Sequence, residues 1–159
     1  HIELICEPEL LGTAGTLIRN SDFFKGEDGL LIHADNYCLS DLNAFINAHQ
    51  RRPERCEMTM MTFRADEPSS CGIVKLDDDG VVTEFYEKIE TPPGNVANGA
   101  VYILSSELIN TINVDFSDVF DFSTEVLPYL SQKIYTYMSS DIFIDIGTVE
   151  KYRLANSLC

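Results

Sequence analysis

Two aspartates follow apolar segments that are typical of buried strands. Asp35 comes directly after residues 30–34 (LLIHA), and Asp145 comes directly after residues 142–144 (IFI). In open α/β sheets, ligands bind in the crevice outside the carboxyl ends of the strands. A carboxylate there can hold Mg²⁺, which favours one or two carboxylates together with the phosphate oxygens of a substrate. Each aspartate taken alone is also explained as a residue that caps a helix or stands in a turn.

The two aspartates together indicate a shared cation more strongly than either does alone. At an effective dielectric constant of about 20, two such charges roughly 4 Å apart repel each other by about 4 kcal/mol. A bound cation would offset that repulsion. The sequence leaves open whether Asp35 and Asp145 meet in space.

Three other segments carry groups that suit phosphate or sugar binding. Glu87-Lys88 closes a predicted strand, and a lysine there is either simply solvated or neutralises a phosphate. Asn98-Gly99 is a strong hairpin-turn signal, yet an asparagine amide can also orient sugar hydroxyls. Residues 7–17 (EPELLGTAGTL) hold Gly12 and Gly15, and glycines of this kind let a backbone approach a phosphate closely.

Nucleophilic hydrolysis is disfavoured by the positions of the histidines. His33 lies in a predicted buried strand, His49 on a predicted helix face and His1 at the terminus. None of them forms a Ser-His-Asp or Cys-His arrangement with its surroundings. The sequence likewise offers no aspartate nucleophile in a phosphatase context.

Composition limits the class of protein. A chain of 159 residues with 45% hydrophobic and 23% charged residues suits one globular domain over residues 1–159. The net charge of −15 argues against a nucleic-acid-binding surface. Five scattered cysteines without a CxxC pair favour reduced thiols, and no apolar run is long enough to cross a membrane. We therefore expect a cytoplasmic protein that binds neither nucleic acid nor membrane.

Hydrophobic periodicity predicts alternating strands and helices along the chain. Predicted strands cover residues 1–6, 30–34, 56–63, 73–76, 81–86, 101–104, 133–138 and 142–146. Predicted helices cover residues 13–20, a stripe from 42 to 49 capped by Ser40 or Asp41, 106–112, part of 121–130, and 148–157. The early strand–helix–strand order is typical of a doubly wound parallel sheet, and the hairpin around Asp79-Gly80 makes the sheet mixed. The fold class is thus α/β, with a Rossmann-like, doubly wound mixed sheet.

Six segments in order resemble the sugar-1-phosphate nucleotidyltransferases, also called sugar-nucleotide pyrophosphorylases. The likeness is greatest to the mannose-1-phosphate and heptose-1-phosphate guanylyltransferase type. It covers nearly the whole chain. The matching segments are residues 11–15 (LGTAG), 34–35 (AD), 71–74 (CGIV), 85–88 (FYEK), 98–102 (NGAVY) and 145–148 (DIGT) before Tyr152.

The resemblance implies a reaction and a role for each motif residue. Such enzymes join a sugar 1-phosphate to a nucleoside triphosphate and release pyrophosphate, so the sugar phosphate is the attacking group and no protein nucleophile is required. Catalytic Mg²⁺ would be held by Asp35 and Asp145, and the segment around Gly12 would lie against the base. The remaining roles implied are contact of Lys88 with the sugar phosphate and contact of Glu87, Gly72 and Asn98 with the sugar.

Two departures from the family pattern are visible. The family usually has Asn-Ala-Gly where this chain has Asn98-Gly99-Ala100. The family also begins with a strand, a glycine-rich loop containing Arg, and a Lys beyond it, and residues 1–159 contain no match to them. We therefore expect a domain that is incomplete at its N-terminus, lacks the first strand–loop–helix portion and is inactive or nearly so alone.

A second hypothesis from a different class is a non-catalytic module that binds sugar phosphate or nucleotide, or that associates with itself. A sheet that lacks strands leaves an unpaired edge and uncovered apolar surface, which favours pairing with another chain. On either hypothesis we expect a homo-oligomer.

Overall fold

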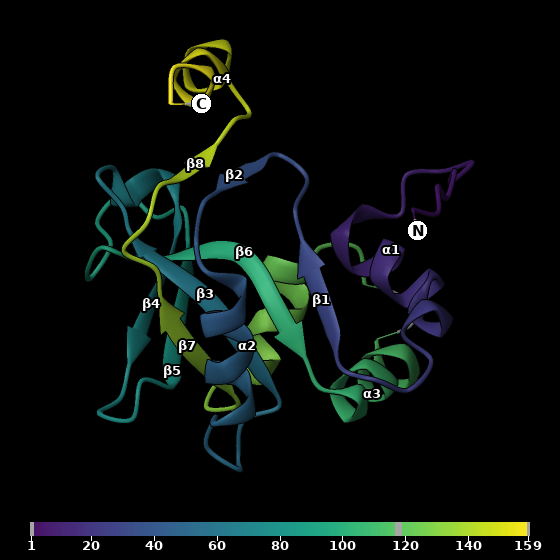
Figure 1. The fold of residues 1–159 in the computed structure, drawn as a ribbon. Helices are drawn as coiled ribbons and strands as arrows, with labels where there is room; N and C mark the ends of the chain where they lie inside the picture. Colours follow the sequence, from purple (N-terminus) through teal and green to yellow (C-terminus); the bar gives the residue numbers. More distant parts are fainter. Residues whose placement is uncertain (1, 117–118, 159) are drawn as a thin grey trace.

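A computed structural model describes residues 2–116 and 119–158 of the chain. It shows an α/β fold with a central six-stranded sheet and a separate two-stranded ribbon (Figure 1). The strands are β1 (Gly29–Ile32), β2 (Asn36–Cys38), β3 (Met58–Arg64), β4 (Gly72–Leu76), β5 (Val82–Glu87), β6 (Val96–Leu104), β7 (Ile134–Met138) and β8 (Phe143–Asp145). The helices and helical turns are α1 (Gly12–Arg19), η1 (Ser21–Phe24), α2 (Leu42–Gln50), η2 (Pro68–Ser70), α3 (Ser106–Asp115), η3 (Phe122–Val126), η4 (Leu127–Leu130) and α4 (Val149–Asn156).

Strand β6 is the centre of the sheet. One edge of β6 pairs with β3, and β3 pairs in turn with β7. Its other edge pairs with β1 near the end of β6 and with β4 near its beginning, and β4 pairs with β5. The β3–β7 pair is parallel, whereas the other pairs of the sheet are antiparallel, so the predicted mixed α/β sheet is confirmed.

The early strand–helix–strand unit differs in one respect from a simple parallel pair. The strands β1 and β3 run in the same direction, since both are antiparallel to β6. They are not neighbours, because β6 lies between them. The helix α2 makes the crossover, and a later segment of the chain fills the place between the two strands.

Local capping sets the helix starts that the sequence predicts. The Asp41 carboxylate accepts hydrogen bonds from the backbone N–H groups of Asn43 and Ala44 at the start of α2. The Thr148 hydroxyl accepts one from Lys151 N–H at the start of α4. Such caps satisfy backbone donors that have no partner inside the helix. Both predicted helix starts are confirmed.

The predicted strand over residues 1–6 is wrong. Residues 2–6 are not in a strand, and His1 lies outside the described residues. Ile2 and Leu4 are 87% and 92% exposed. An alternating sequence forms a strand only where another strand supplies hydrogen bonds and a face to bury, and no described strand pairs with this segment.

The two faces of the sheet are covered by different elements. In Figure 1 α2 crosses the front of the sheet, and the light-green turns η3 and η4 lie behind it. Phe45 of α2 packs with Val101 and Ile103 on the front face. Tyr102 and Leu104 pack with Phe122 and neighbouring residues on the opposite face. Because side chains alternate along β6, successive residues serve the two faces in turn.

Candidate functional site

The candidate site lies at a gap on one edge of β6. Strand β1 pairs with this edge as far as Val101, and β4 pairs with it again at Ala97. Residues 98–100 of β6 fall between the two. Strand β1 ends at this gap, and β4 begins at it with Gly72. Three of the segments that resemble the family motifs, residues 34–35, 71–74 and 98–102, therefore converge here from separate parts of the chain.

A bulge in β6 shapes the gap. Met60 pairs with Tyr102 and Thr62 pairs with Asn98. Four residue positions along β6 therefore correspond to two along β3. Ala100 adopts the left-handed conformation within this bulge, with a φ of 50°. The predicted alternative of a hairpin turn at Asn98-Gly99 is wrong, because both residues lie inside β6.

The bulge also fixes the segment that follows β1. The carbonyl of Ala100 accepts a hydrogen bond from His33 N–H at 3.3 Å. The carbonyl of Gly99 accepts one from the Asn36 side-chain amide at 3.1 Å. A bulge disrupts the strand pairing locally and leaves residues without a ladder partner, so these carbonyls accept bonds from the segment after β1 instead. The residues on either side of Asp35 are therefore both tied to β6.

The backbones that carry Asp35 and Asp145 lie side by side. Asn36 pairs with Asp145 in the β2–β8 ribbon, and Ile146 N–H donates to the carbonyl of Asp35 at 2.8 Å. Both aspartates are exposed. One carboxylate oxygen of Asp145, Oδ1, accepts a hydrogen bond from Gly147 N–H at 2.8 Å, which orients that carboxylate. The structure thus brings together two acids that are 110 positions apart in the sequence.

Asn98 lies in the part of β6 that borders the gap, and both polar atoms of its side-chain amide form hydrogen bonds. Its Nδ2 donates to the Tyr102 hydroxyl at 2.7 Å, and its Oδ1 accepts from Ala100 N–H at 2.9 Å. Tyr102 is fully buried, and burial raises the pKa of its hydroxyl far above the ordinary value. The hydroxyl therefore remains a neutral hydrogen-bonding group that fixes the orientation of Asn98.

Gly72, Glu87 and Lys88 lie on the β4 side of the gap. Gly72 pairs with Glu87 across the two strands, and a Cβ on Gly72 would come within 2.8 Å of Glu87 Oε2. Lys88 Nζ lies 3.6 Å from Glu87 Oε1, and the Lys88 side chain is 67% exposed. The missing side chain at Gly72 leaves room for the Glu87 carboxylate. The Lys88 side chain pairs with that carboxylate and is exposed enough to meet an anion from solvent as well.

Gly12 is the one predicted site residue whose described contacts lie elsewhere. It opens α1 with a φ of 71°, and a Cβ there would come within 2.2 Å of the Phe120 carbonyl oxygen. Ala14 N–H also donates to that carbonyl, and Phe122 N–H donates to the Thr13 hydroxyl. These contacts join α1 to the segment before η3. They explain why the segment needs a glycine without calling on a ligand.

Several features of the site have no signal in the sequence. Asn36 belongs to the site because its side-chain amide donates to the Gly99 carbonyl. Ala100 belongs to it because its backbone bonds to His33 and Asn98, whereas the sequence marks Ala100 only as a departure from Asn-Ala-Gly. A pocket of about 310 Å³ also lies beyond Gly99, at the ends of β3 and β7. Its lining residues are Phe63, Arg64, Met138, Ser139, Ser140, Asp141 and Phe143.

The described residues set limits on metal binding and membrane insertion. Within residues 2–116 and 119–158, no group of three or more His, Cys, Asp or Glu side chains is placed to hold a metal ion. In the same part of the chain, no helix combines the length and the apolar character that crossing a bilayer requires. Any cation at Asp35 and Asp145 would therefore need further ligands from a substrate or from water.

Comparison with known proteins agrees with this arrangement. A glucose-1-phosphate adenylyltransferase from Lachnospira eligens is 28% identical over 153 residues, which are 91% of this chain and 36% of that protein. A mannose-1-phosphate guanylyltransferase from Mycobacterium tuberculosis is 27% identical over 156 residues, 96% of this chain and 42% of that protein. The chain thus spans less than half the length of these relatives.

Solved structures and a family model extend the comparison. The crystal structure of HddC from Yersinia pseudotuberculosis complexed with GMP-PN matches 97% of this chain and 65% of that one, with a TM-score of 0.79 and 26% identity. The family model described as nucleotidyl transferase matches residues 1–159. The Rossmann-like α/β fold expected from the sequence is confirmed by these matches. On this evidence of sequence and structure, the chain belongs to the nucleotidyl transferase family.

Proposed function

We propose that this chain supplies the sugar-phosphate and metal sites of a sugar-1-phosphate nucleotidyltransferase. The observation that carries the proposal is the convergence of Asp35, Asp145, Asn98, Gly72 and Glu87-Lys88 around the β6 gap and the adjoining ribbon. In the reaction, a phosphate oxygen of the sugar 1-phosphate attacks the α-phosphorus of a nucleoside triphosphate. The bond from the α-phosphorus to the bridging oxygen breaks, and pyrophosphate leaves.

The donor set suits Mg²⁺. Two exposed carboxylates on neighbouring backbones match a cation that takes one or two protein carboxylates and completes its shell with phosphate oxygens and water. The hydrogen bond from Gly147 N–H occupies one oxygen of Asp145 and leaves the other for a cation. Bound Mg²⁺ would offset negative charge on the phosphates during the displacement.

The side chains of the gap have separable roles in this proposal. Lys88 neutralises the sugar phosphate as a mobile point charge. Glu87 accepts hydrogen bonds from sugar hydroxyls, Gly72 gives it room, and the fixed amide of Asn98 orients the sugar. The α1 start around Gly12 lies against the base. Alignment and charge neutralisation then supply the acceleration, without a protein nucleophile.

The finer proposal is formation of GDP-mannose or a GDP-heptose. It is supported by the guanylyltransferase relative and by the likeness to a protein complexed with GMP-PN. The adenylyltransferase relative is of similar identity, so glucose 1-phosphate with ATP is the competing pair. Pyrophosphate release measured with each pair distinguishes them. Pyrophosphate release with glucose 1-phosphate and ATP, and none with mannose 1-phosphate and GTP, would overturn the guanosine assignment.

Calorimetry tests the site without requiring that residues 1–159 complete the reaction. Mg²⁺ and mannose 1-phosphate are titrated into the chain and into the Asp145→Asn variant, whose amide oxygen can still accept the Gly147 hydrogen bond. We expect weaker Mg²⁺ binding by the variant, because one carboxylate charge is lost. Equal affinity in the two proteins would remove Asp145 from the metal site. Asp141→Asn, on the loop before β8, serves as the matched control.

A second candidate function is a module that pairs with a second copy of itself. Among the described strands, β1 pairs with β6 alone, so its outer edge is open. Leu30 and Ile32 on β1, and Leu42 and Ile46 on α2, are each 43% exposed. An open edge beside apolar side chains favours strand pairing between chains. Sedimentation should show a mass that rises with concentration, and a monomer at all concentrations would exclude this candidate.

A further inference from the structure

His33 lies at the point where β1 meets the gap on β6. Its backbone N–H donates to the Ala100 carbonyl, directly after the pairing of Ile32 with Val101. Side chains alternate along a strand, so His33 shares a face with Leu31 rather than with Ile32. Leu31 pairs with Tyr102 and packs against the core cluster that contains it. The imidazole is thus on the face where the Tyr102 hydroxyl holds the Asn98 amide.

The imidazole has an unused hydrogen-bonding atom. His33 Nε2 is buried and has no hydrogen-bond partner among the described residues. The structure describes one other such nitrogen, Nε2 of His49, but that atom lies 3.3 Å from an Asp28 carboxylate oxygen. Buried polar atoms in folded proteins almost always have a partner, and each exception calls for an explanation. His33 therefore carries an unmet hydrogen bond beside the proposed sugar site.

A hydroxyl group is the ligand chemistry that fits this atom. A neutral imidazole nitrogen is a donor in one tautomer and an acceptor in the other, and a hydroxyl can answer either. The neighbouring groups of the gap, Asn98 and Glu87, are also suited to hydroxyls. Two sources are available under the proposed function, namely the hexose of a sugar 1-phosphate and the ribose of a nucleotide.

We propose that His33 Nε2 forms a hydrogen bond to a hydroxyl of the bound substrate and so helps to position it. This inference rests on the proposed function, because that function supplies the sugar. His33 is then a substrate-binding residue on the β1 side of the gap, opposite Gly72 and Glu87 on the β4 side. It acts as a hydrogen-bonding group that positions the substrate.

Nuclear magnetic resonance of the imidazole nitrogens tests the contact directly. The chain is labelled with ¹⁵N and titrated separately with mannose 1-phosphate and with GTP, each in the presence of Mg²⁺. We expect the Nε2 signal of His33 to shift with the ligand that supplies the hydroxyl, while the signals of His49 stay in place. A shift with only one ligand identifies the source. Binding of both ligands with no shift at His33 would overturn the proposal.

A variant that keeps the ring shape gives an independent readout. His33→Phe removes both nitrogens and places an apolar ring in the same space, and Ile32→Ala on the opposite face of β1 is the matched control. We expect His33→Phe to bind the relevant ligand about 3- to 10-fold more weakly, the effect of one neutral hydrogen bond, without a lower melting temperature. The control should bind as the wild type does.

The outcomes separate the two proposals. Wild-type chain that binds neither ligand counts against the proposed function, and the His33 proposal fails with it. If the wild-type chain and His33→Phe bind the ligand equally tightly, the proposed function stands and the role of His33 is overturned. A lower melting temperature of His33→Phe with unchanged affinity assigns the nitrogen a structural role and likewise overturns the proposal.

Discussion

Gly72 lies directly opposite Glu87 in the β4–β5 hairpin, and a Cβ on Gly72 would come within 2.8 Å of a Glu87 carboxylate oxygen. It would also come within 2.8 Å of the Phe85 ring. Gly72→Ala should therefore displace the carboxylate and weaken binding of a sugar 1-phosphate, with a stability loss of about 1–3 kcal/mol from overpacking. Calorimetry and urea unfolding measure the two effects. Gly94→Ala is the control, because a Cβ there meets nothing within 4 Å.

Lys88 should contribute to phosphate affinity and little to stability. Its side chain is 67% exposed, with Glu87 as a neighbour at 3.6 Å. We expect Lys88→Gln to weaken binding of mannose 1-phosphate by about 10- to 100-fold, the usual effect of a charge-assisted hydrogen bond. Lys75→Gln on the same hairpin removes an exposed lysine that pairs with Glu84, and it should leave affinity unchanged. Equal losses in the two variants would point to general electrostatics instead of a contact.

Gly12 should matter for packing as well as for backbone conformation. Gly12 and Gly26 both have positive φ, of 71° and 79°, but only the Cβ added at Gly12 would meet a close neighbour, the Phe120 carbonyl oxygen. Gly26→Ala should lose about 1–2 kcal/mol from left-handed strain. Gly12→Ala should lose that amount and about 1–3 kcal/mol more, because the α1 start must move away from Phe120. Urea unfolding of both variants gives the difference, and equal losses would contradict the predicted clash.

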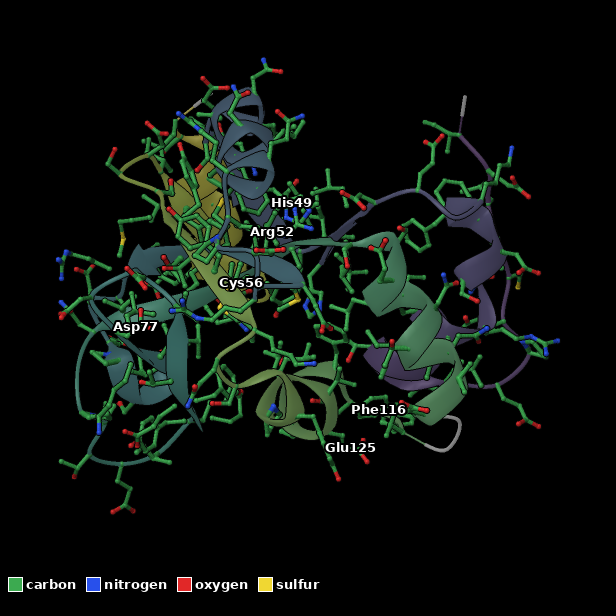
Figure 2. The ribbon with its side chains drawn as sticks, turned by 90° about the horizontal axis from the view of Figure 1, so that it is seen from below. His49, Arg52, Cys56, Asp77, Phe116 and Glu125 are labelled. Carbon is green, nitrogen blue, oxygen red and sulfur yellow. The ribbon has the colours of Figure 1, made fainter. Side chains whose placement is uncertain are left out.

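His49 should make stability depend on pH. It lies at the end of α2 beside Arg52 (Figure 2), with Nδ1 2.8 Å from the Thr59 hydroxyl. Burial, followed by the positive charge of Arg52, lowers the pKa of His49 from 6.5, although Asp28 partly opposes this. The folded state then binds fewer protons than the unfolded state once the pH falls below about 6.5. The stability that His49 contributes is fully present above about pH 6.5, and it is lost as the pH falls toward the lowered pKa of His49.

Urea unfolding between pH 7.5 and 5.5 measures this slope. The free energy of unfolding should fall across the interval in the wild type, and His49→Gln should flatten the profile while lowering stability at pH 7.5. An unchanged slope in the variant would assign the pH dependence to other groups.

The local elements of this protein follow from its sequence because their causes are local. An apolar run that ends in Ala34-Asp35, a carboxylate cap at Asp41 and a turn at Asp79-Gly80 each act within a few residues, and the elements they predict are present. The order of the family motifs also predicted the fold and the family. Periodicity failed at residues 1–6, since a strand requires a partner that no local pattern supplies.

The site itself depends on tertiary structure. Only strand pairing decides that Asn36 lies opposite Asp145, that Asn98-Gly99 lies inside a bulged strand instead of a turn, and that the start of β4 faces the end of β1. These relations join residues far apart in the chain, and they result from the register and edge choices of β6. Sequence therefore determined which groups are available for chemistry, and the packing of β6 between its neighbours decided which of them meet, because hydrogen-bonded register is a property of paired strands and not of either strand alone.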